Sequence, residues 1–113
     1  MANYNQFDIV WAQFPLSDKL DKLKMRPVMI VSNAESNSLD NDIMVCPITS
    51  RLRGDMFSLL LLDSMISIPL NIVSEIRCNK IMTLRHNLIT EKAGCLNEIF
   101  HRILLQKLFL AFR

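Results

Sequence analysis

Two short segments place an arginine and two hydroxyl side chains at predicted strand ends, where they could act together on a phosphate. Arg26 precedes the apolar run Pro27 to Ser32, and Thr49 and Ser50 follow a second apolar run, Asp42 to Cys46. A guanidinium has a planar fork of donors that matches two phosphoryl oxygens, and it stays charged at any working pH. On their own, both features are ordinary: a solvated strand-end arginine and a hydroxyl turn.

A third set of polar side chains falls in the extended segment Asn71 to Leu84. Glu75, Arg77 and Asn79 stand two residues apart, so a strand would project them to one face. A carboxylate in this position could accept a proton. A plain salt bridge from Glu75 to Arg77 or to a neighbouring strand is the more ordinary use, and the residues favour it slightly.

Basic residues gather beside two of these segments. The formal net charge is only +2, so any affinity for nucleic acid has to come from a local patch. The stretch from Leu16 to Met25 has no glycine, and we interpret it as a charged loop. Lysines there would supply a salt-sensitive, sequence-independent part of any nucleic-acid binding. The charged residues concerned are Asp18, Lys19, Asp21, Lys22 and Lys24, with Arg51 and Arg53 after the Thr49 corner.

The elements that would carry these residues are short strands followed by one helix. Strands of this length at short spacing predict a β-rich α+β fold, in which a bent antiparallel sheet or partly open barrel packs beside the helix. At 113 residues the chain holds one domain, residues 1–113. The predicted strands are Phe7 to Phe14, Pro27 to Ser32, Asp42 to Cys46, Met56 to Leu62, and Asn71 to Leu84.

The closing helix begins after Asn97, which we expect to cap it. Apolar residues recur there at steps of three and four, and further apolar residues lie outside that stripe. The surplus fits burial against a second subunit or against the monomer's own sheet, and the sequence does not choose between them. The stripe contains Ile99, Phe100, Ile103, Leu104, Leu108 and Ala111; the surplus is Leu105, Phe109, Leu110 and Phe112.

Composition excludes several classes of protein. No apolar run approaches the ~18 residues of a membrane span, and the N-terminus lacks the features of a secretion signal, so we expect a cytoplasmic protein. Cys46, Cys78 and Cys95 form no Cys-x-x-Cys pair and stand away from both histidines, which predicts reduced thiols and no metal site.

Four segments, in this order and spacing, resemble the MazF/PemK family of toxins. Any one motif is weak, because Arg-Pro before an apolar strand is common, but the ordered set is hard to produce by chance. The resemblance covers nearly the entire chain, including the closing helix. The segments are Phe7 to Trp11, Arg26 to Asn33, Cys46 to Ser50, and Ile76 to Leu84.

The resemblance implies an SH3-like, CcdB-like small barrel with a C-terminal helix, acting as a homodimer that cuts single-stranded RNA without metal or other cofactor. The family's catalytic arginine falls on Arg26 and its hydroxyl residue on Thr49; in some relatives a later arginine, here Arg77, serves the leaving oxygen. RNA carries its own nucleophile, the ribose 2′-OH, so the enzyme has only to position the phosphate, stabilise negative charge and manage two protons. The products would end in a 2′,3′-cyclic phosphate and a 5′-hydroxyl.

The sequence departs from the family at the proton acceptor. Relatives with an Arg-x-Asp pair use the aspartate to take the 2′-OH proton, whereas this chain has Asn79, and an amide cannot accept a proton at neutral pH. Glu75 is the nearest substitute, and an enzyme that relies on Arg26 and Thr49 alone, or a weak enzyme, are the alternatives. The expected RNA-contacting residues are Asp21, Lys22, Lys24, Ser50, Arg53 and Asn79.

The family also implies a protein partner, a cognate antitoxin whose disordered acidic tail folds over the RNA groove. Two rival functions remain. One is a gyrase-poisoning toxin of the CcdB type, which shares the barrel but acts through the end of its helix; the ending Leu108 to Arg113 lacks the tryptophan and small-residue tail expected for that role. The other is a relative that binds RNA without cutting it.

Overall fold

A computed structural model describes residues 4–16 and 19–113 of the chain, and their side chains except at positions 15–23. In chain order it contains β1 (Asp8–Leu16), β2 (Lys19–Ile30), α1 (Ala34–Leu39), β3 (Asp42–Thr49), β4 (Ser58–Leu61), η1 (Asp63–Met65), β5 (Ser74–Arg77), β6 (Met82–Arg85), η2 (His86–Leu88), β7 (Ile89–Cys95), η3 (Glu98–Phe100), α2 (His101–Phe109) and η4 (Leu110–Phe112).

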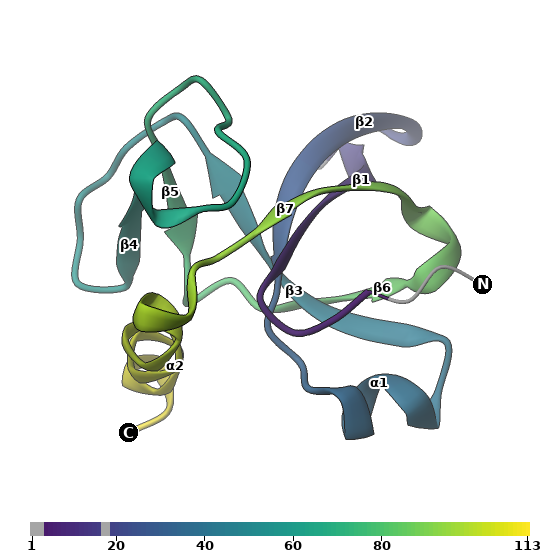
Figure 1. The fold of residues 1–113 in the computed structure, drawn as a ribbon. Coiled ribbons are helices and arrows are strands. Elements are labelled where there is room, and N and C mark those ends of the chain that lie inside the picture. Colours follow the sequence, from purple (N-terminus) through teal and green to yellow (C-terminus); the bar gives the residue numbers. More distant parts are fainter. Residues whose placement is uncertain (1–3, 17–18) are drawn as a thin grey trace.

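The strands of the described chain form one seven-stranded, antiparallel sheet in the order β4-β5-β3-β2-β1-β7. Strand β3 is central to this sheet. It pairs with β2 along one edge; along its other edge, its first half pairs with β6 and its end pairs with β5. Figure 1 shows the consequence: β4, β5 and α2 lie on one side of the molecule, and β6 and α1 on the other. The expected small, bent sheet with a closing helix is confirmed.

Two hydrophobic cores lie on opposite faces of the central strands. Along β3, Ile43 and Val45 enter one core while Cys46 and Ile48 enter the other, as the regular alternation of a strand requires. The larger core is completed by β4, β5 and two buried residues of α2, Leu104 and Leu108. A continuous apolar run such as that of β3 is therefore explained by burial on both faces.

The closing helix is present but starts differently from the prediction. Asn97 does not cap it, because its side-chain amide donates to the carbonyl of Ser64 at 3.1 Å instead. The first turn is a 3₁₀ turn, and the α-helix proper begins at His101. No helix in the described part of the chain has the length and apolar character to cross a membrane.

Three strand predictions need correction. The stretch expected as a loop from Leu16 to Met25 is largely strand, because β2 begins at Lys19 and pairs along β1. The segment Asn71 to Leu84 divides into β5 and β6, with a turn between them. Strand β7 was not predicted, since only two of its seven residues are buried and it lacks an apolar alternation.

Candidate active site

Strand register brings four candidate side chains into one row. Extending the β2–β3 register two residues beyond its last pair sets Arg26 opposite Thr49, and the β3–β5 ladder pairs Thr49 with Glu75. Arg77 follows two residues later on the same face of β5. Opposite residues on antiparallel strands have Cβ atoms roughly 4.5–5.5 Å apart. Thr49, Glu75 and Arg77 are thus neighbours on β3 and β5, and the extended register adds Arg26 of β2 to this row, two residues beyond the last pair that the two strands form.

The hydroxyl of Thr49 is oriented by the turn that follows β3. Its Oγ1 accepts the backbone N–H of Arg51 at 3.1 Å, the hydroxyl turn expected at this strand end. Because that bond uses only acceptor capacity, the hydroxyl proton is left to donate elsewhere. A half-buried threonine held in this way can present an O–H to a phosphate oxygen.

Glu75 is the most enclosed charged residue of the row, with 1% of its surface exposed. Its Oε1 accepts the backbone N–H groups of Arg53 at 2.8 Å and Gly54 at 3.2 Å. Its Oε2 accepts the hydroxyl of Ser58 at 2.9 Å and lies 3.4 Å from Nε of Arg77. The salt bridge to Arg77 that the sequence favoured is confirmed.

These contacts determine the protonation of Glu75. Burial by itself raises the pKa of its carboxyl, but three hydrogen bonds and the Arg77 charge more than offset this, so the pKa lies below the usual 4.5. A carboxylate with a lowered pKa and both oxygens occupied is a poor proton acceptor. The geometry therefore speaks against Glu75 as the substitute base.

Arg77 is largely enclosed as well. Its Nη2 donates to the carbonyl of Arg51 at 2.9 Å, and only 12% of its side chain is exposed. The contact between Nε and Glu75 lacks hydrogen-bond geometry, so this pair is held by charge rather than by a directed bond. Arg77 is thus held in a fixed position against the loop that follows β3, with a small part of its side chain exposed.

Arg26 has a different environment. It is half-buried on β2, opposite Ala12 of β1. Within the described side chains, no hydrogen bond or ion pair engages its guanidinium, so it is available for a ligand. Lys24, on the same strand, is exposed, as are Ser50 and Arg53 in the loop after β3. The predicted contacts at Asp21 and Lys22 concern side chains outside the described ones.

The prediction that Asn79 shares a strand face with Glu75 and Arg77 is wrong. Strand β5 ends at Arg77, and the chain turns at residues 78–79, where the N–H of Lys80 donates to the carbonyl of Arg77 at 3.1 Å. Cys78 remains buried while Asn79 is exposed in the turn. Asn79 therefore lies next to the row in sequence but does not share the strand face of Arg77.

The sequence predicted that Ser50, Arg51 and Arg53 lie at the site, but it did not reveal that the loop of residues 50–57 encloses the carboxylate of Glu75. Gly54 adopts φ +64° there, and its N–H and that of Arg53 serve the buried carboxylate. From α2, Nζ of Lys107 donates to the carbonyl of Met56 at 3.0 Å. A buried charge needs hydrogen-bond partners. A glutamate in an apolar strand, together with an Arg-Gly-Asp turn elsewhere in the chain, was therefore the sequence signal that could have predicted this contact.

The comparisons with known proteins identify the family and the fold of the chain. Residues 5–112 match the family of PemK-like, MazF-like toxins of type II toxin–antitoxin systems. A comparison of the sequence with curated proteins gives no match. Among solved structures, the Mycobacterium tuberculosis toxin MazF-mt6 is similar at 25% identity and a TM-score of 0.75, with 93% of this chain and 95% of that chain covered.

Two further structures share the fold at lower identity. MazF from Deinococcus radiodurans matches with a TM-score of 0.77 at 18% identity, covering 97% of this chain and 96% of its own. An endoribonuclease in complex with its cognate antitoxin, from a mycobacterial species, matches with a TM-score of 0.79 at 16% identity, covering 96% and 94%. From the match along nearly its whole length, this chain belongs to the PemK-like, MazF-like toxin family of type II toxin–antitoxin systems.

Proposed function

We propose that this toxin is a metal-independent endoribonuclease that cleaves single-stranded RNA in the cytoplasm, as one domain over residues 1–113. The observation that carries the proposal is the row of Arg26, Thr49 and Arg77 across β2, β3 and β5. These three side chains supply positive charge and a hydroxyl donor, which is what a phosphodiester needs when its own 2′-OH is the nucleophile. Two structural relatives carry the name endoribonuclease.

Each residue of the row has a distinct part in the proposed reaction. Arg26, without a partner among the described side chains, binds two non-bridging oxygens of the scissile phosphate and offsets the charge that develops on them. The free O–H of Thr49 donates to the same phosphate. Arg77 adds fixed positive charge near the leaving 5′-oxygen. The 2′-oxygen bonds to phosphorus as the bond from phosphorus to the 5′-oxygen breaks, which leaves a 2′,3′-cyclic phosphate; the 2′-OH proton passes to water, and the leaving 5′-oxygen takes a proton from water to become the 5′-hydroxyl.

The proposed RNA path runs over exposed polar residues around the row. Lys24 on β2 and Ser50 and Arg53 after β3 are exposed, and the exposed Asn79 follows β5. Asp21 and Lys22 precede Lys24 on the same strand and complete the path. Cations that contact phosphates make binding salt-dependent, so we expect affinity for single-stranded RNA to fall steeply with ionic strength.

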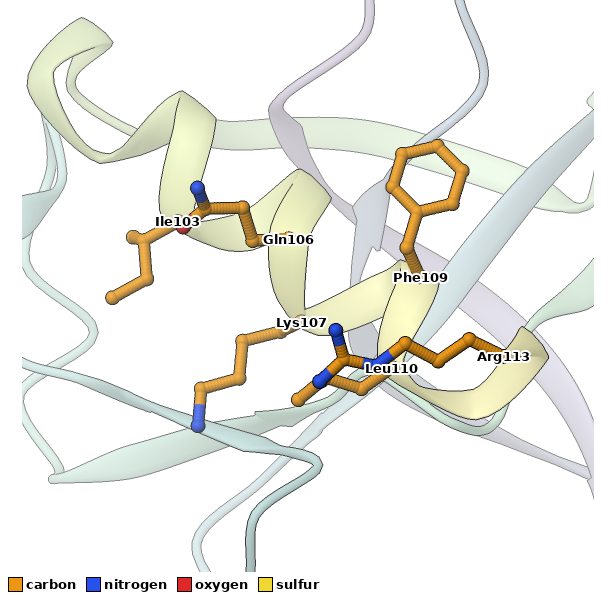
Figure 2. Close-up of a pocket in the computed structure, with 6 residues that line it drawn as sticks. All are labelled: Ile103, Gln106, Lys107, Phe109, Leu110 and Arg113. Atoms are coloured by element: carbon orange, nitrogen blue, oxygen red, sulfur yellow. The ribbon is translucent and has the colours of Figure 1, made fainter.

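We further propose that the toxin is a homodimer that pairs through α2. Phe109 and Phe112 are 67% and 73% exposed, more apolar surface than a short helix ordinarily leaves in water. Phe109, Lys107 and Arg113 are among the residues that line a pocket of about 500 Å³ at the end of this helix; Figure 2 shows these side chains. A second copy of the helix would cover this apolar surface.

The proposed protein partner is a cognate antitoxin with an acidic tail. One structural relative is described in complex with its cognate antitoxin, and related MazE–MazF complexes from Deinococcus radiodurans share the fold. An acidic segment would be attracted to the basic residues around the RNA path. Bound antitoxin should protect Lys22, Lys24 and Arg53 from lysine- and arginine-modifying reagents; full modification in the complex would contradict this placement.

One experiment tests the central proposal. The purified toxin is incubated with a single-stranded RNA in the presence of a chelator, and the product ends are analysed. Ends bearing 2′,3′-cyclic phosphate and 5′-hydroxyl are expected, whereas a metal-activated water would typically leave a 5′-phosphate. Cleavage that stops in chelator, or binding without cleavage, would reject the mechanism; the second outcome would identify an RNA-binding relative instead.

A further inference from the structure

We propose that Glu75 is a positioning residue that fixes the loop of residues 50–57 above the row, and that it does not accept the 2′-OH proton. This inference rests on the proposed RNA cleavage for its consequences in activity, but its structural content does not depend on cleavage. It concerns the one buried carboxylate of the site and the loop that carries the exposed Ser50, Arg51 and Arg53.

Most of the acceptor capacity of Glu75 is already used. An ionised carboxylate has about four acceptor positions; two N–H groups and one hydroxyl donate to its oxygens, and the Arg77 guanidinium lies beside Oε2 as a charge partner without a directed bond. A ribose hydroxyl would have to displace one of these donors from a residue that is 1% exposed. The carboxylate therefore faces the loop and not the solvent side of the row.

The loop is held at several backbone groups by side chains from outside it. Glu75 accepts the N–H groups of Arg53 and Gly54, and its ion-pair partner Arg77 donates to the carbonyl of Arg51. Lys107 of α2 holds the carbonyl of Met56. The buried pair on β5 and a lysine on the closing helix therefore clamp the loop at both of its ends.

The clamp reaches the reacting group through Thr49. Its Oγ1 accepts the N–H of Arg51, whose carbonyl is the group that Arg77 holds. If the loop moved, Thr49 would lose the bond that orients its hydroxyl, and Arg77 would lose the bond that fixes its guanidinium. Glu75 therefore acts on the phosphate only through Thr49 and Arg77.

Two substitutions separate a clamp from a base. In Glu75→Gln, the amide oxygen can still accept the N–H groups of Arg53 and Gly54, and the amide nitrogen can donate to Ser58, although the ion pair is lost. In Glu75→Ala every contact is lost, and the two N–H groups are left without an acceptor. An amide can replace a clamp but not a base.

The experiment compares Glu75→Gln and Glu75→Ala with a matched exposed strand glutamate, Glu91→Gln on β7. Single-turnover cleavage is measured in chelator, and amide hydrogen exchange of Arg53 and Gly54 is measured by NMR on the free protein. We expect Glu75→Gln to keep both amides protected and to lose about tenfold or less in rate, the effect of one net hydrogen bond. Glu75→Ala should expose both amides and cost on the order of a hundredfold or more.

The outcomes keep this inference separate from the proposed function. If Glu75→Gln is as inactive as Glu75→Ala while both amides stay protected, Glu75 is a base and the clamp is wrong. If Arg53 and Gly54 stay protected in Glu75→Ala, the clamp is wrong whether or not RNA is cut. If the wild type cuts no RNA, the proposed function fails, and the amide hydrogen exchange of Arg53 and Gly54 alone tests whether Glu75 fixes the loop. If Glu75→Ala does not fold, near-wild-type cleavage by Glu75→Gln supports the clamp and its loss refutes it.

Discussion

Removing the guanidinium of Arg26 is the most direct test of the proposed phosphate site. The side chain is half-buried on β2, faces Thr49 in the extended register, and has no partner among the described side chains. Arg26→Ala therefore takes away charge without breaking an internal ion pair. We expect the fold to survive, with a change of only about 0.5 kcal/mol in the free energy of unfolding, typical of such positions.

Arg26→Ala should reduce the rate of RNA cleavage far more than it reduces the stability of the fold. Removing one preorganised donor that meets developing charge commonly costs on the order of 10²–10³ in rate. Arg26→Lys keeps the charge but loses the two-pronged geometry, so we expect an intermediate rate. Because one phosphate contact disappears, the salt dependence of binding single-stranded RNA should also weaken, by about 0.7 in the slope of log K against log salt.

The assay is single-turnover cleavage of a fluorescent RNA in chelator, with binding measured at several salt concentrations. Arg85→Ala is the matched control, since Arg85 is an exposed strand arginine on β6 that pairs with Asp42 at 3.6 Å. Thr49→Ala should also nearly abolish cleavage. Arg26 and Thr49 are proposed to act on one phosphate, so the double variant should lose less than the product of the single losses. Wild-type rates for a folded Arg26→Ala would refute the site.

Three further predictions follow from burial and charge. Phe109→Glu places a charge in the exposed apolar surface of α2 and should turn the proposed dimer into a monomer in light scattering, while Leu39→Glu, at an exposed apolar residue of α1, should not; a dimer that persists would contradict pairing through α2. Burial, with Cys78 nearby, raises the pKa of Cys46 to about 12, and burial raises that of Cys78 to about 11, so at pH 8 only about one Cys46 thiol in 10⁴ is ionised. Mass spectrometry after native alkylation should therefore find Cys95 modified first, and equal labelling would contradict this. The pKa of Glu75 is lowered on folding, so its contribution to stability is present above pH 4.5 and is lost as the pH falls through the folded value. Urea unfolding at pH 7 and pH 4 should show a smaller acid loss for Glu75→Gln than for the wild type, and an equal loss would contradict the lowered pKa.

The sequence predicted those elements whose burial leaves a pattern. Strand β3 is an apolar run because it is packed on both faces, and the helical spacing near the C-terminus reflects Leu104 and Leu108 in the larger core. Strand β7 and the outer part of β2 are held by backbone pairing to β1 instead. Backbone hydrogen bonds need no particular side chain, so these strands can contain many charged residues. Such strands have no apolar alternation, and a prediction based on periodicity misses them.

The site divides in the same way. Arg26 and Thr49 are side chains on strands whose alignment could be taken from a family resemblance, and extending the β2–β3 register by two residues sets them opposite each other. The partners of Glu75 are mostly backbone N–H groups of a loop, which every residue other than proline can supply. The salt bridge to Arg77 was foreseeable from the spacing of two residues, whereas the enclosure by residues 50–57 depends on where the chain folds back.

The need for a proton acceptor can be tested at Asn79, the position where some relatives have an aspartate. The carboxylate of Glu75 is already engaged by other groups and does not fill that role. Asn79 is exposed in the turn that follows Arg77, so a carboxylate there would be solvated and ionised at neutral pH. If proton removal from the 2′-OH limits the rate, Asn79→Asp should raise it by about tenfold or more, the lower part of the range for a positioned base. The gain should disappear below the ordinary aspartate pKa of about 3.9. Asn87→Asp, which adds the same charge in η2, is the control. An unchanged rate in Asn79→Asp would mean either that the turn holds the carboxylate out of reach or that another step is limiting. A solvent isotope effect near unity in the wild type would identify the second case, and a large one would show that a base at this turn does not serve the reaction.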